Sequence, residues 1–323
     1  MKDILHKSLY REKAKRIFID IFMDRLNLSN IVKLITIYKM RFPTLEEIEG
    51  FREAFMQFCE KVYLGDFPAI NIVGSGGDGK NTFNISTLAC FVVAGAGCKV
   101  IKHGNYSVSS ITGSSTLLKK LGYTFPKNES QLKKNLEISG ICYLHTPLFH
   151  PLLEKISIIR KELSIKTFFN ILGPLISPIE TKKFLIGASD FNVARLYNIF
   201  YQKTDYYYSI IHSFDGYDEI SLTDNFICYT RKGEKPYSPN ELGQKKNDEN
   251  EVIGGKSIEE NTNIFFDILS KKGTFAQNEV VLTNTAFALM LLNKENFEKS
   301  YSLARESLKS GKAKEVLKNF LDK

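Results

Sequence analysis

The feature that most constrains the fold is a short apolar segment that leads directly into a glycine-rich loop. Residues 69–73 read as a buried strand, and they are followed by Gly74-Ser75-Gly76-Gly77-Asp78-Gly79. Residues 86–96 then have the composition of a buried helix. A strand, a glycine loop and a helix in this order are typical of α/β proteins that bind phosphate, because the loop and the helix N-terminus present backbone N–H groups.

The alternation of strands and helices continues along the chain. We expect further strands at residues 98–102, 141–144, 184–188 and 206–212, and helices at residues 114–121, 191–203 and 275–293. This order predicts an α/β fold with a mostly parallel central sheet. Residues 231–262 are polar and rich in turn formers, so we expect them to form a surface excursion without a direct role in function.

The first 66 residues have a different pattern. Ile17, Phe18 and Ile21 recur at helical spacing, and Thr44 with Glu47 forms a capping box that opens another helix. Because no strand pattern precedes residue 68, we expect a small helical domain at residues 1–66 and an α/β domain at residues 67–323.

The glycine loop fits G-x-G-x-x-G, but its surroundings exclude the two familiar nucleotide sites. A dinucleotide site needs an acidic residue about 20 positions further on, and no Asp or Glu lies between Gly79 and Asn128. A P-loop needs Ser or Thr after its lysine, whereas Asn81 follows Lys80. The acid-free stretch is rich in lysine and hydroxyl side chains, so it predicts a phosphate site of another kind.

An acidic pair lies far from the loop in sequence. Asp218 and Glu219 follow the expected strand at residues 206–212. Because Mg²⁺ is usually held by one or two carboxylates together with substrate phosphates, this pair is a candidate metal site for the ligand of the glycine loop. An exposed acidic turn would have the same sequence.

Composition restricts the partners and the location. The chain has 44 Lys and Arg against 36 Asp and Glu, and this net charge of +8 favours an anionic partner, either a phosphorylated metabolite or nucleic acid. The five cysteines form no C-x-x-C pair, so we expect reduced thiols, no zinc site and a cytoplasmic protein. The longest weakly polar run, residues 88–98, is shorter than the roughly 20 residues that span a membrane, so we expect no membrane partner.

Several stretches resemble the anthranilate phosphoribosyltransferase family, in the order in which that family has them. They are GSGGDGKNTFNIST (74–87), KHGNYSVSS (102–110), GSS (113–115), PLFHP (147–151), IRKELSIKTFFNILGPL (159–175) and DGYDEISLT (215–223). Residues 40–51 also resemble the family's N-terminal region, so the resemblance covers essentially the whole chain.

The resemblance implies a small N-terminal α-helical domain hinged to a larger α/β domain, with residues near 150–182 packing back on the helical domain, in a homodimer. It implies Mg²⁺-dependent transfer of the 5-phosphoribosyl group from phosphoribosyl pyrophosphate to the amine of anthranilate, a step of tryptophan biosynthesis. The products would be N-(5-phosphoribosyl)anthranilate and pyrophosphate. We expect a direct displacement without a covalent nucleophile.

The resemblance also implies site residues. Those for phosphoribosyl pyrophosphate are Gly74, Gly77, Asp78, Thr82, Asn84, Ile85, Ser86, Thr87, Lys102, His103, Gly104, Asn105, Tyr106, Ser107, Val108, Ser109, Ser110 and Ser114. Those for anthranilate are Gly74, Asn105 and Arg160, and those for two Mg²⁺ ions per subunit are Ser86, Asp218 and Glu219.

The chain departs from the family pattern at a few positions near the expected site. Tyr106 stands where the family usually has Arg, Thr116 where it has Asp, and Ser164 and Lys166 where it has Gly and Arg. These changes leave the expected core ligands in place and bear on the affinity or choice of acceptor.

Two alternatives share the fold or the charge. One is a pyrimidine nucleoside phosphorylase, against which residues 84–87 and the acidic pair argue. The other is a non-catalytic nucleic-acid-binding paralogue, which the net charge permits but which has no need of Asp218, Glu219 and Arg160.

Overall fold

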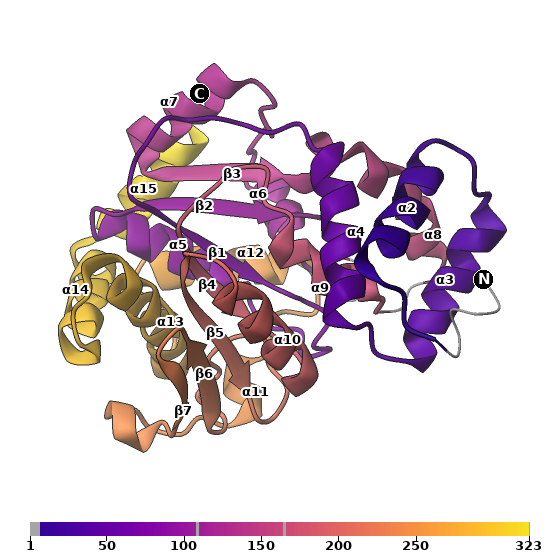
Figure 1. The fold of residues 1–323 in the computed structure, drawn as a ribbon. Helices are drawn as coiled ribbons and strands as arrows, with labels where there is room; N and C mark the ends of the chain where they lie inside the picture. The colour runs from indigo at the N-terminus through magenta and orange to yellow at the C-terminus, as the bar shows by residue number, and fades with distance from the viewer. Residues whose placement is uncertain (1–6, 108–109, 164–165, 323) are drawn as a thin grey trace.

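The computed structural model describes residues 7–107, 110–163 and 166–322. Within them, seven strands form one sheet in the order β3-β2-β1-β4-β5-β6-β7 (Figure 1). The strands are β1 (Ala69–Gly74), β2 (Lys99–Gly104), β3 (Ile141–His145), β4 (Lys183–Gly187), β5 (Tyr207–Ser213), β6 (Phe226–Thr230) and β7 (Gly233–Tyr237). Strands β1 to β5 are parallel, whereas β6 and β7 are antiparallel additions at one edge. The expected α/β fold with a mostly parallel sheet is confirmed.

Helices surround this sheet. Before the sheet come α2 (Arg11–Phe22), α3 (Leu28–Met40) and α4 (Leu45–Gln57). Between the strands lie α5 (Ile85–Gly95), α6 (Ser114–Lys120), α7 (Glu129–Ser139), α8 (Pro151–Leu163), α9 (Phe168–Leu172) and α10 (Phe191–Gln202), with the 3₁₀ turns η1 (Thr146–Leu148) and η2 (Gly173–Leu175). After β7 come η3 (Asn240–Leu242), α11 (Glu249–Val252), α12 (Ile258–Leu269), α13 (Phe275–Asn293), α14 (Phe297–Ser310) and α15 (Lys312–Leu321).

Both faces of the sheet are buried, as parallel strands require. Ile70 and Ile72 of β1 belong to a core that also contains the apolar residues of α5, α13, α14 and α15. Val73 of β1 and Phe184 of β4 belong to a second core, which runs on into the N-terminal helices. The sheet is therefore a layer between two sets of helices.

The N-terminal helices contact α9 through a cluster of aromatic rings. Phe18 of α2 lies 4.7 Å from Phe51 of α4, measured between ring centroids, and 5.9 Å from Phe169 of α9. Phe168 of α9 packs on Phe51 at 5.4 Å. Figure 1 shows α2, α3, α4 and α8 grouped at one end of the molecule, with α9 between them and the sheet.

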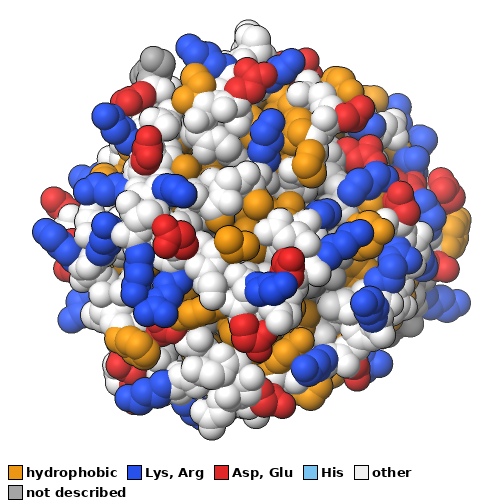
Figure 2. All heavy atoms as spheres, turned by 90° about the vertical axis from the view of Figure 1, so that its left-hand side faces the viewer, with side chains coloured by type: hydrophobic (Ala, Val, Ile, Leu, Met, Phe, Trp, Pro, Cys, Tyr) orange, Lys and Arg blue, Asp and Glu red, His pale blue; other side chains and the backbone are white. Residues whose placement is uncertain are grey.

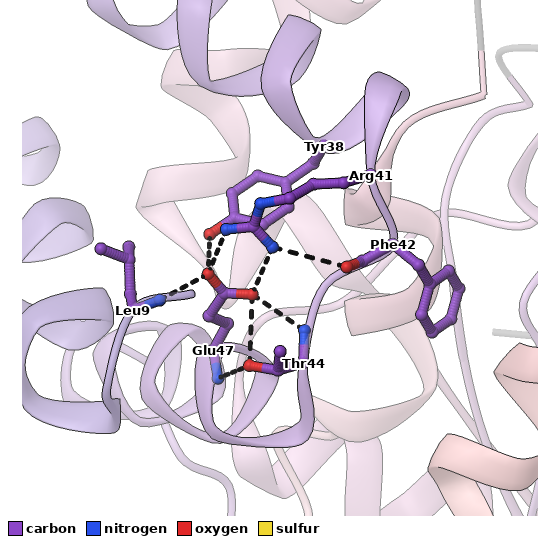
Figure 3. Close-up of polar contacts among 6 residues, drawn as sticks. All are labelled: Leu9, Tyr38, Arg41, Phe42, Thr44 and Glu47. Carbon is purple, nitrogen blue, oxygen red and sulfur yellow. Dashed lines mark hydrogen bonds and ion pairs between the residues drawn. The ribbon is translucent and has the colours of Figure 1, made fainter. Parts of the chain in front are cut away.

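A buried ion pair fixes the relation between these N-terminal helices (Figure 3). Glu47 is completely buried at the start of α4 and accepts hydrogen bonds from both Nη atoms of Arg41, at 2.9 and 2.5 Å. It also accepts bonds from the Tyr38 hydroxyl, the Leu9 N–H and the Thr44 N–H. The capping box of Thr44 and Glu47 is confirmed, and its carboxylate joins α3, α4 and the segment before α2.

The hairpin of β6 and β7 was not expected from the sequence. Its outer strand β7 lies within residues 231–262 and carries Glu234, Lys235 and Pro236, all exposed. Charged residues and proline are common on edge strands because they discourage pairing with another chain.

Figure 2 shows basic side chains interspersed with acidic ones over the face that carries α14 and α15, without a continuous basic stripe on that face. None of the described helices is long and apolar enough to cross a membrane.

Candidate active site

The glycine loop lies where the order of the strands reverses. The chain runs from β1 outward to β2 and β3, and then returns to β4 on the other side of β1. Gly74 at the end of β1 pairs with Gly187 at the end of β4, and the Ser75 N–H donates to the Gly187 carbonyl at 2.9 Å. Loops diverge at such a switch point and leave a crevice at the carboxyl ends of the strands, which is where open α/β sheets bind ligands.

A cavity of about 260 Å³ occupies this crevice. The expected site residues that line it are Gly74, Gly77, Asp78, Thr82, Asn84, Ser86, Thr87, Lys102, His103, Gly104, Asn105, Tyr106, Ser107, Ser110, Ser114, Asp218 and Glu219. Segments as distant in sequence as residues 74–87 and 218–219 thus share one cavity.

A few expected residues are not placed in this cavity. Ile85 is completely buried in the core at the first position of α5 and does not line the cavity. Val108 and Ser109 lie outside the described residues. Arg160 belongs to α8, and its side chain lies outside what the structure describes.

Asp218 and Glu219 reach the glycine loop and the start of α5. The Gly76 N–H donates to Asp218 Oδ2 at 2.6 Å, and the Ser86 N–H donates to Glu219 Oε1 at 2.7 Å. The Thr82 hydroxyl donates to Glu219 Oε2 at 3.2 Å. The acidic pair is therefore held in the crevice and is not a solvated turn.

Burial raises the pKa of the Asp218 carboxyl well above its usual range, and the nearby charges of Asp78 and Glu219 raise it further. Burial also raises the pKa of Glu219, partly offset by the Ser86 N–H. Neighbouring buried carboxylates of this kind favour a cation between them and the rest of the site.

The start of α5 and the end of β2 supply groups suited to an anion. Asn84 precedes α5 in the left-handed conformation, with φ 60°, and donates to the Thr112 carbonyl at 2.9 Å, while its Oδ1 is buried without a partner among the described residues. Lys102 of β2 is buried, and its ammonium donates to the Ile72 carbonyl at 3.2 Å and to the Ser86 hydroxyl at 3.4 Å. A buried ammonium beside a helix N-terminus creates a positive pole in the crevice.

Gly104, at the end of β2, allows Ser114 and Tyr143 to approach the backbone closely in the wall of the cavity. A Cβ at Gly104 would lie 2.2 Å from the Ser114 hydroxyl and 2.6 Å from the Tyr143 hydroxyl. Tyr143 in turn bonds to Ser114 at 2.9 Å and to Ser115 at 2.7 Å. The close approach brings Ser114 to the cavity and leaves no room for a side chain at residue 104.

One departure from the family pattern, Tyr106, lines the cavity. Tyr106, which is 38% exposed, packs edge-on against His145 with ring centroids 4.7 Å apart. Phe125 also stacks on this histidine, with ring centroids 4.6 Å apart, and the Lys119 ammonium lies 5.8 Å from the Tyr106 ring. This wall of the site is aromatic and has a cation beside it.

His103 is held as a neutral imidazole. Its Nε2 bonds the Gly173 carbonyl at 3.0 Å, and since a carbonyl only accepts, this nitrogen carries the proton. Asn71 donates to its Nδ1 at 3.3 Å. Burial lowers the pKa of His103 to about 4. Both ring nitrogens are thus occupied, which leaves none free to accept a proton from a substrate.

The sequence analysis missed several lining residues, which are Val73, Ser75, Gly76, Asn81, Thr112, Gly113, Thr146, Leu153, Phe169, Asn170, Gly173 and Ile176. Val73, Ser75, Gly76, Asn81 and Gly113 each neighbour an expected residue, and Phe169, Asn170 and Gly173 lie within the matching stretch at residues 159–175, so proximity to the motifs was the available signal for these. Phe169 is both buried in the core and part of the cavity wall.

The donor set fits Mg²⁺. Asp218, Glu219 and Ser86 offer the oxygen ligands that this ion prefers, and the unpartnered Oδ1 of Asn84 adds an acceptor to the same crevice. The described residues contain no cluster of three or more His, Cys, Asp or Glu side chains able to hold a metal ion by themselves. Such a partial set suits an ion that also takes ligands from a phosphorylated substrate.

Comparison with known proteins agrees with this site. The model of the glycosyl transferase family, a/b domain, matches residues 66–314. The anthranilate phosphoribosyltransferase of Flavobacterium psychrophilum is 46% identical over 323 residues, covering 98% of this chain and 98% of that protein. Among solved structures, the anthranilate phosphoribosyltransferase of Thermus thermophilus superposes with a TM-score of 0.89 and 27% identity, covering 99% of this chain and 97% of that one.

The enzyme of the same name from Saccharomyces cerevisiae, solved in complex with phosphoribosyl pyrophosphate and Mg, superposes with a TM-score of 0.82 and 27% identity, covering 91% of this chain and 84% of that chain. The likeness therefore extends through the helical N-terminus, the sheet and the crevice alike. By sequence and by fold, the chain belongs to the anthranilate phosphoribosyltransferase family.

Proposed function

We propose that this chain transfers the 5-phosphoribosyl group from phosphoribosyl pyrophosphate to the amine of anthranilate, giving N-(5-phosphoribosyl)anthranilate and pyrophosphate in tryptophan biosynthesis. The observation that carries the proposal is the meeting of the glycine loop, the start of α5, Lys102 and the acidic pair in one crevice. That combination suits a substrate that has several phosphate groups and travels with a divalent cation.

The phosphates of the donor occupy the positive part of the crevice. The backbone around Gly77 and the N-terminus of α5 face it, and Lys102 supplies a full positive charge. Ser107, Ser110 and Ser114 add hydroxyl donors on the opposite wall. As charge grows on the leaving pyrophosphate, fixed donors of this kind stabilise the transition state more than the ground state.

Asp218, Glu219 and Ser86 would hold Mg²⁺, and we propose two ions per subunit. Bound there, Mg²⁺ supplies charge stabilisation of the leaving group. The raised pKa values of the two carboxyls describe the chain alone, and a cation between them favours their ionised forms.

The reaction is a single displacement at C1 of the ribose. The amine nitrogen forms a bond to C1 as the bond from C1 to the pyrophosphate oxygen breaks with its electron pair, and the amine then loses a proton to water. His103 orients the Gly173 turn beside the acceptor and takes no proton. Because an aromatic amine is a weak nucleophile, orientation supplies much of the rate, up to roughly 7–11 kcal/mol in well-aligned cases.

The acceptor end is assigned to Gly74, Asn105 and Arg160. Asn105 lines the cavity, and its Oδ1 accepts the Tyr106 N–H at 2.7 Å, which fixes the side chain near the mouth. Arg160 suits the carboxylate of anthranilate because a guanidinium binds a carboxylate through two parallel hydrogen bonds.

We also propose that residues 1–66, together with residues near 150–182, form a helical domain that hinges against the rest of residues 67–323, in a cytoplasmic homodimer. Contacts such as that between Arg52 Nε of α4 and the Leu175 carbonyl, at 2.8 Å, support the grouping of these segments. All five cysteines are free, which supports a reducing compartment.

The test is the loss of anthranilate fluorescence in the presence of phosphoribosyl pyrophosphate and Mg²⁺. Asp218→Asn should lower the rate on the order of 100-fold or more, because it removes a ligand for the cation. The matched control is Asp224→Asn, which removes the same charge from an exposed residue paired with Lys246. Arg160→Ala should raise the KM for anthranilate. A folded wild type that binds phosphoribosyl pyrophosphate but turns over no anthranilate would overturn the acceptor assignment.

A further inference from the structure

The loop that carries the acidic pair is anchored from the side that faces away from the cavity. Ser213, completely buried at the end of β5, donates its hydroxyl proton to the Glu219 carbonyl at 2.7 Å. Its backbone N–H donates to the Tyr217 carbonyl at 3.2 Å. The loop is thereby closed on the strand from which it starts.

The other anchor is Asn284, in the middle of α13. Its Oδ1 accepts the Ile220 N–H at 3.1 Å, and its Nδ2 donates to the Ile220 carbonyl at 2.8 Å and to the Val280 carbonyl at 2.8 Å. The carboxamide thus binds both polar backbone groups of the residue that directly follows Glu219. Asn284 is only 5% exposed and lies within the buried stretch of α13 from Val280 to Leu289.

An asparagine at this position is costly unless it has a specific task. Asparagine is a poor helix former, and a buried amide without hydrogen-bond partners lowers the stability of the fold by about 1–3 kcal/mol. Here both ends of the amide are used, and two of its three bonds go to the loop and not to its own helix.

The loop has little freedom to move toward the sheet. A Cβ at Gly74 would lie 2.5 Å from Asp218 Oδ2, so the loop rests directly on the end of β1. Contacts of this loop with Gly74 and with Asn284 therefore fix where the carboxylates of Asp218 and Glu219 enter the cavity.

We propose that Asn284 is a positioning residue, which acts through the backbone of Ile220 to set the carboxylates of Asp218 and Glu219 for the magnesium complex of phosphoribosyl pyrophosphate. The inference rests on the proposed function for the identity of that ligand. Outer partners of metal ligands are worth about 10–100-fold in metal affinity or activity.

The experiment compares Asn284→Leu with Thr285→Val. Thr285 is the next residue on α13, is also buried, and donates its hydroxyl proton to the Val281 carbonyl of its own helix at 2.8 Å. Binding of phosphoribosyl pyrophosphate is measured by calorimetry over a range of Mg²⁺ concentrations, and thermal melting is followed in parallel. We expect Asn284→Leu to raise the Mg²⁺ concentration for half-maximal binding about 10-fold or more, and Thr285→Val to leave it unchanged.

A lower melting temperature in Asn284→Leu with an unchanged Mg²⁺ requirement would reduce Asn284 to a structural role and overturn the inference. If Asn284→Leu does not fold, Ser213→Ala removes the anchor at the other end of the loop and should shift the Mg²⁺ requirement in the same direction. Because the readout is binding of the donor, wild type that binds it but does not use anthranilate would count against the proposed acceptor and not against the role of Asn284.

Discussion

Gly187 lies directly beneath the backbone of Asp218, so close that a Cβ atom at residue 187 would come within 1.5 Å of the Asp218 carbonyl oxygen. Gly187 ends β4 and pairs with Gly74, which ends β1. The two glycines at the switch point of the sheet therefore provide the space in which the loop that carries Asp218 and Glu219 rests. At Gly187 the missing side chain lets the Asp218 backbone approach, and at Gly74 it makes room for the Asp218 carboxylate.

Gly187→Ala should displace this loop and impair Mg²⁺-dependent turnover, because backbone cannot yield to a methyl group as a flexible side chain can. A misplacement of about 1 Å in a site of this kind can cost on the order of 10²-fold in rate. Gly97→Ala is the control, since residue 97 has φ +88° but a Cβ there would meet open space in the described part of the chain. It should cost roughly 1 kcal/mol of stability without changing the Mg²⁺ requirement.

Glu47→Gln should destabilise the N-terminal helices without altering the chemistry of the site. It leaves the buried end of the Arg41 guanidinium against a neutral amide, and breaking a buried pair in this way costs about 3–5 kcal/mol. Urea unfolding at pH 7 gives the free energy of unfolding. Glu46→Gln, at the exposed neighbouring position of the same helix, should change it by less than about 0.5 kcal/mol.

The contribution of Glu47 should also depend on pH. Burial by itself would raise the pKa of this carboxyl, but hydrogen bonds from Arg41, the Leu9 N–H, the Thr44 N–H and Tyr38 outweigh burial and lower it from its usual 4.5 to about 2. A carboxyl whose pKa falls on folding stabilises the protein above pH 4.5 and loses that effect as the pH falls through 2. The difference in unfolding free energy between wild type and Glu47→Gln should therefore shrink over this range, and a constant difference would contradict the lowered pKa.

His103→Gln tests whether the cavity contains a general base. Glutamine can still donate to the Gly173 carbonyl, so the turn should keep its place, and the rate should fall by less than the roughly 10²–10⁴-fold typical of a lost base. Because burial lowers the pKa of His103 to about 4, the kcat/KM profile between pH 6 and pH 8 should keep its shape in the variant. Disappearance of an ionisation in that range would show that His103 exchanges a proton during the reaction.

Local patterns predicted most of the sheet. The strands β1 to β5 lie within a residue or two of the expected segments, because each is a short, mostly buried segment that contains apolar residues, and α13 has the expected bounds. The helical spacing of Ile17, Phe18 and Ile21 corresponds to α2, which ends at Phe22. The β6–β7 hairpin was missed because its exposed strand, Gly233–Tyr237, contains glycine, charges and proline, which by themselves favour a turn.

The site was predicted where its residues follow strands, and missed where contact depends on the tertiary fold. Asp218 and the glycine loop were suggested by composition, since each has a chemical signature. Gly187 and Asn284 have no such signature, because a glycine in a strand and an amide in a helix are common. Their role depends on the loop that packs on them. The division at residue 66, the homodimer and the role of Arg160 stay predictions.

The polar stretch at residues 231–262 was expected to have no direct role, yet its end is tied to the glycine loop. The Gly254 N–H donates to the Asn81 carbonyl at 2.7 Å, and Thr82 and Ile253 form an isolated β-bridge. Asn261, completely buried on α12, accepts the Gly255 N–H and donates to the Gly255 carbonyl, each at 3.1 Å. It also donates to the Thr112 hydroxyl at 3.1 Å, so one amide links this turn to the cavity wall.

Asn261→Ala should therefore weaken binding of phosphoribosyl pyrophosphate on the order of 10-fold, the equivalent of one displaced hydrogen bond of roughly 1.4 kcal/mol. Thr262→Val is the matched control, because Thr262 is a buried neighbour whose hydroxyl donates to the Ile258 carbonyl of its own helix, at 2.7 Å. Calorimetric titration of each variant at saturating Mg²⁺ measures the affinity, with melting temperature recorded beside it. Equal losses of affinity in the two variants would mean that α12 supports the site only through general stability. A loss confined to Asn261→Ala would place the turn at residues 254–255 among the elements that hold the glycine loop in its binding conformation.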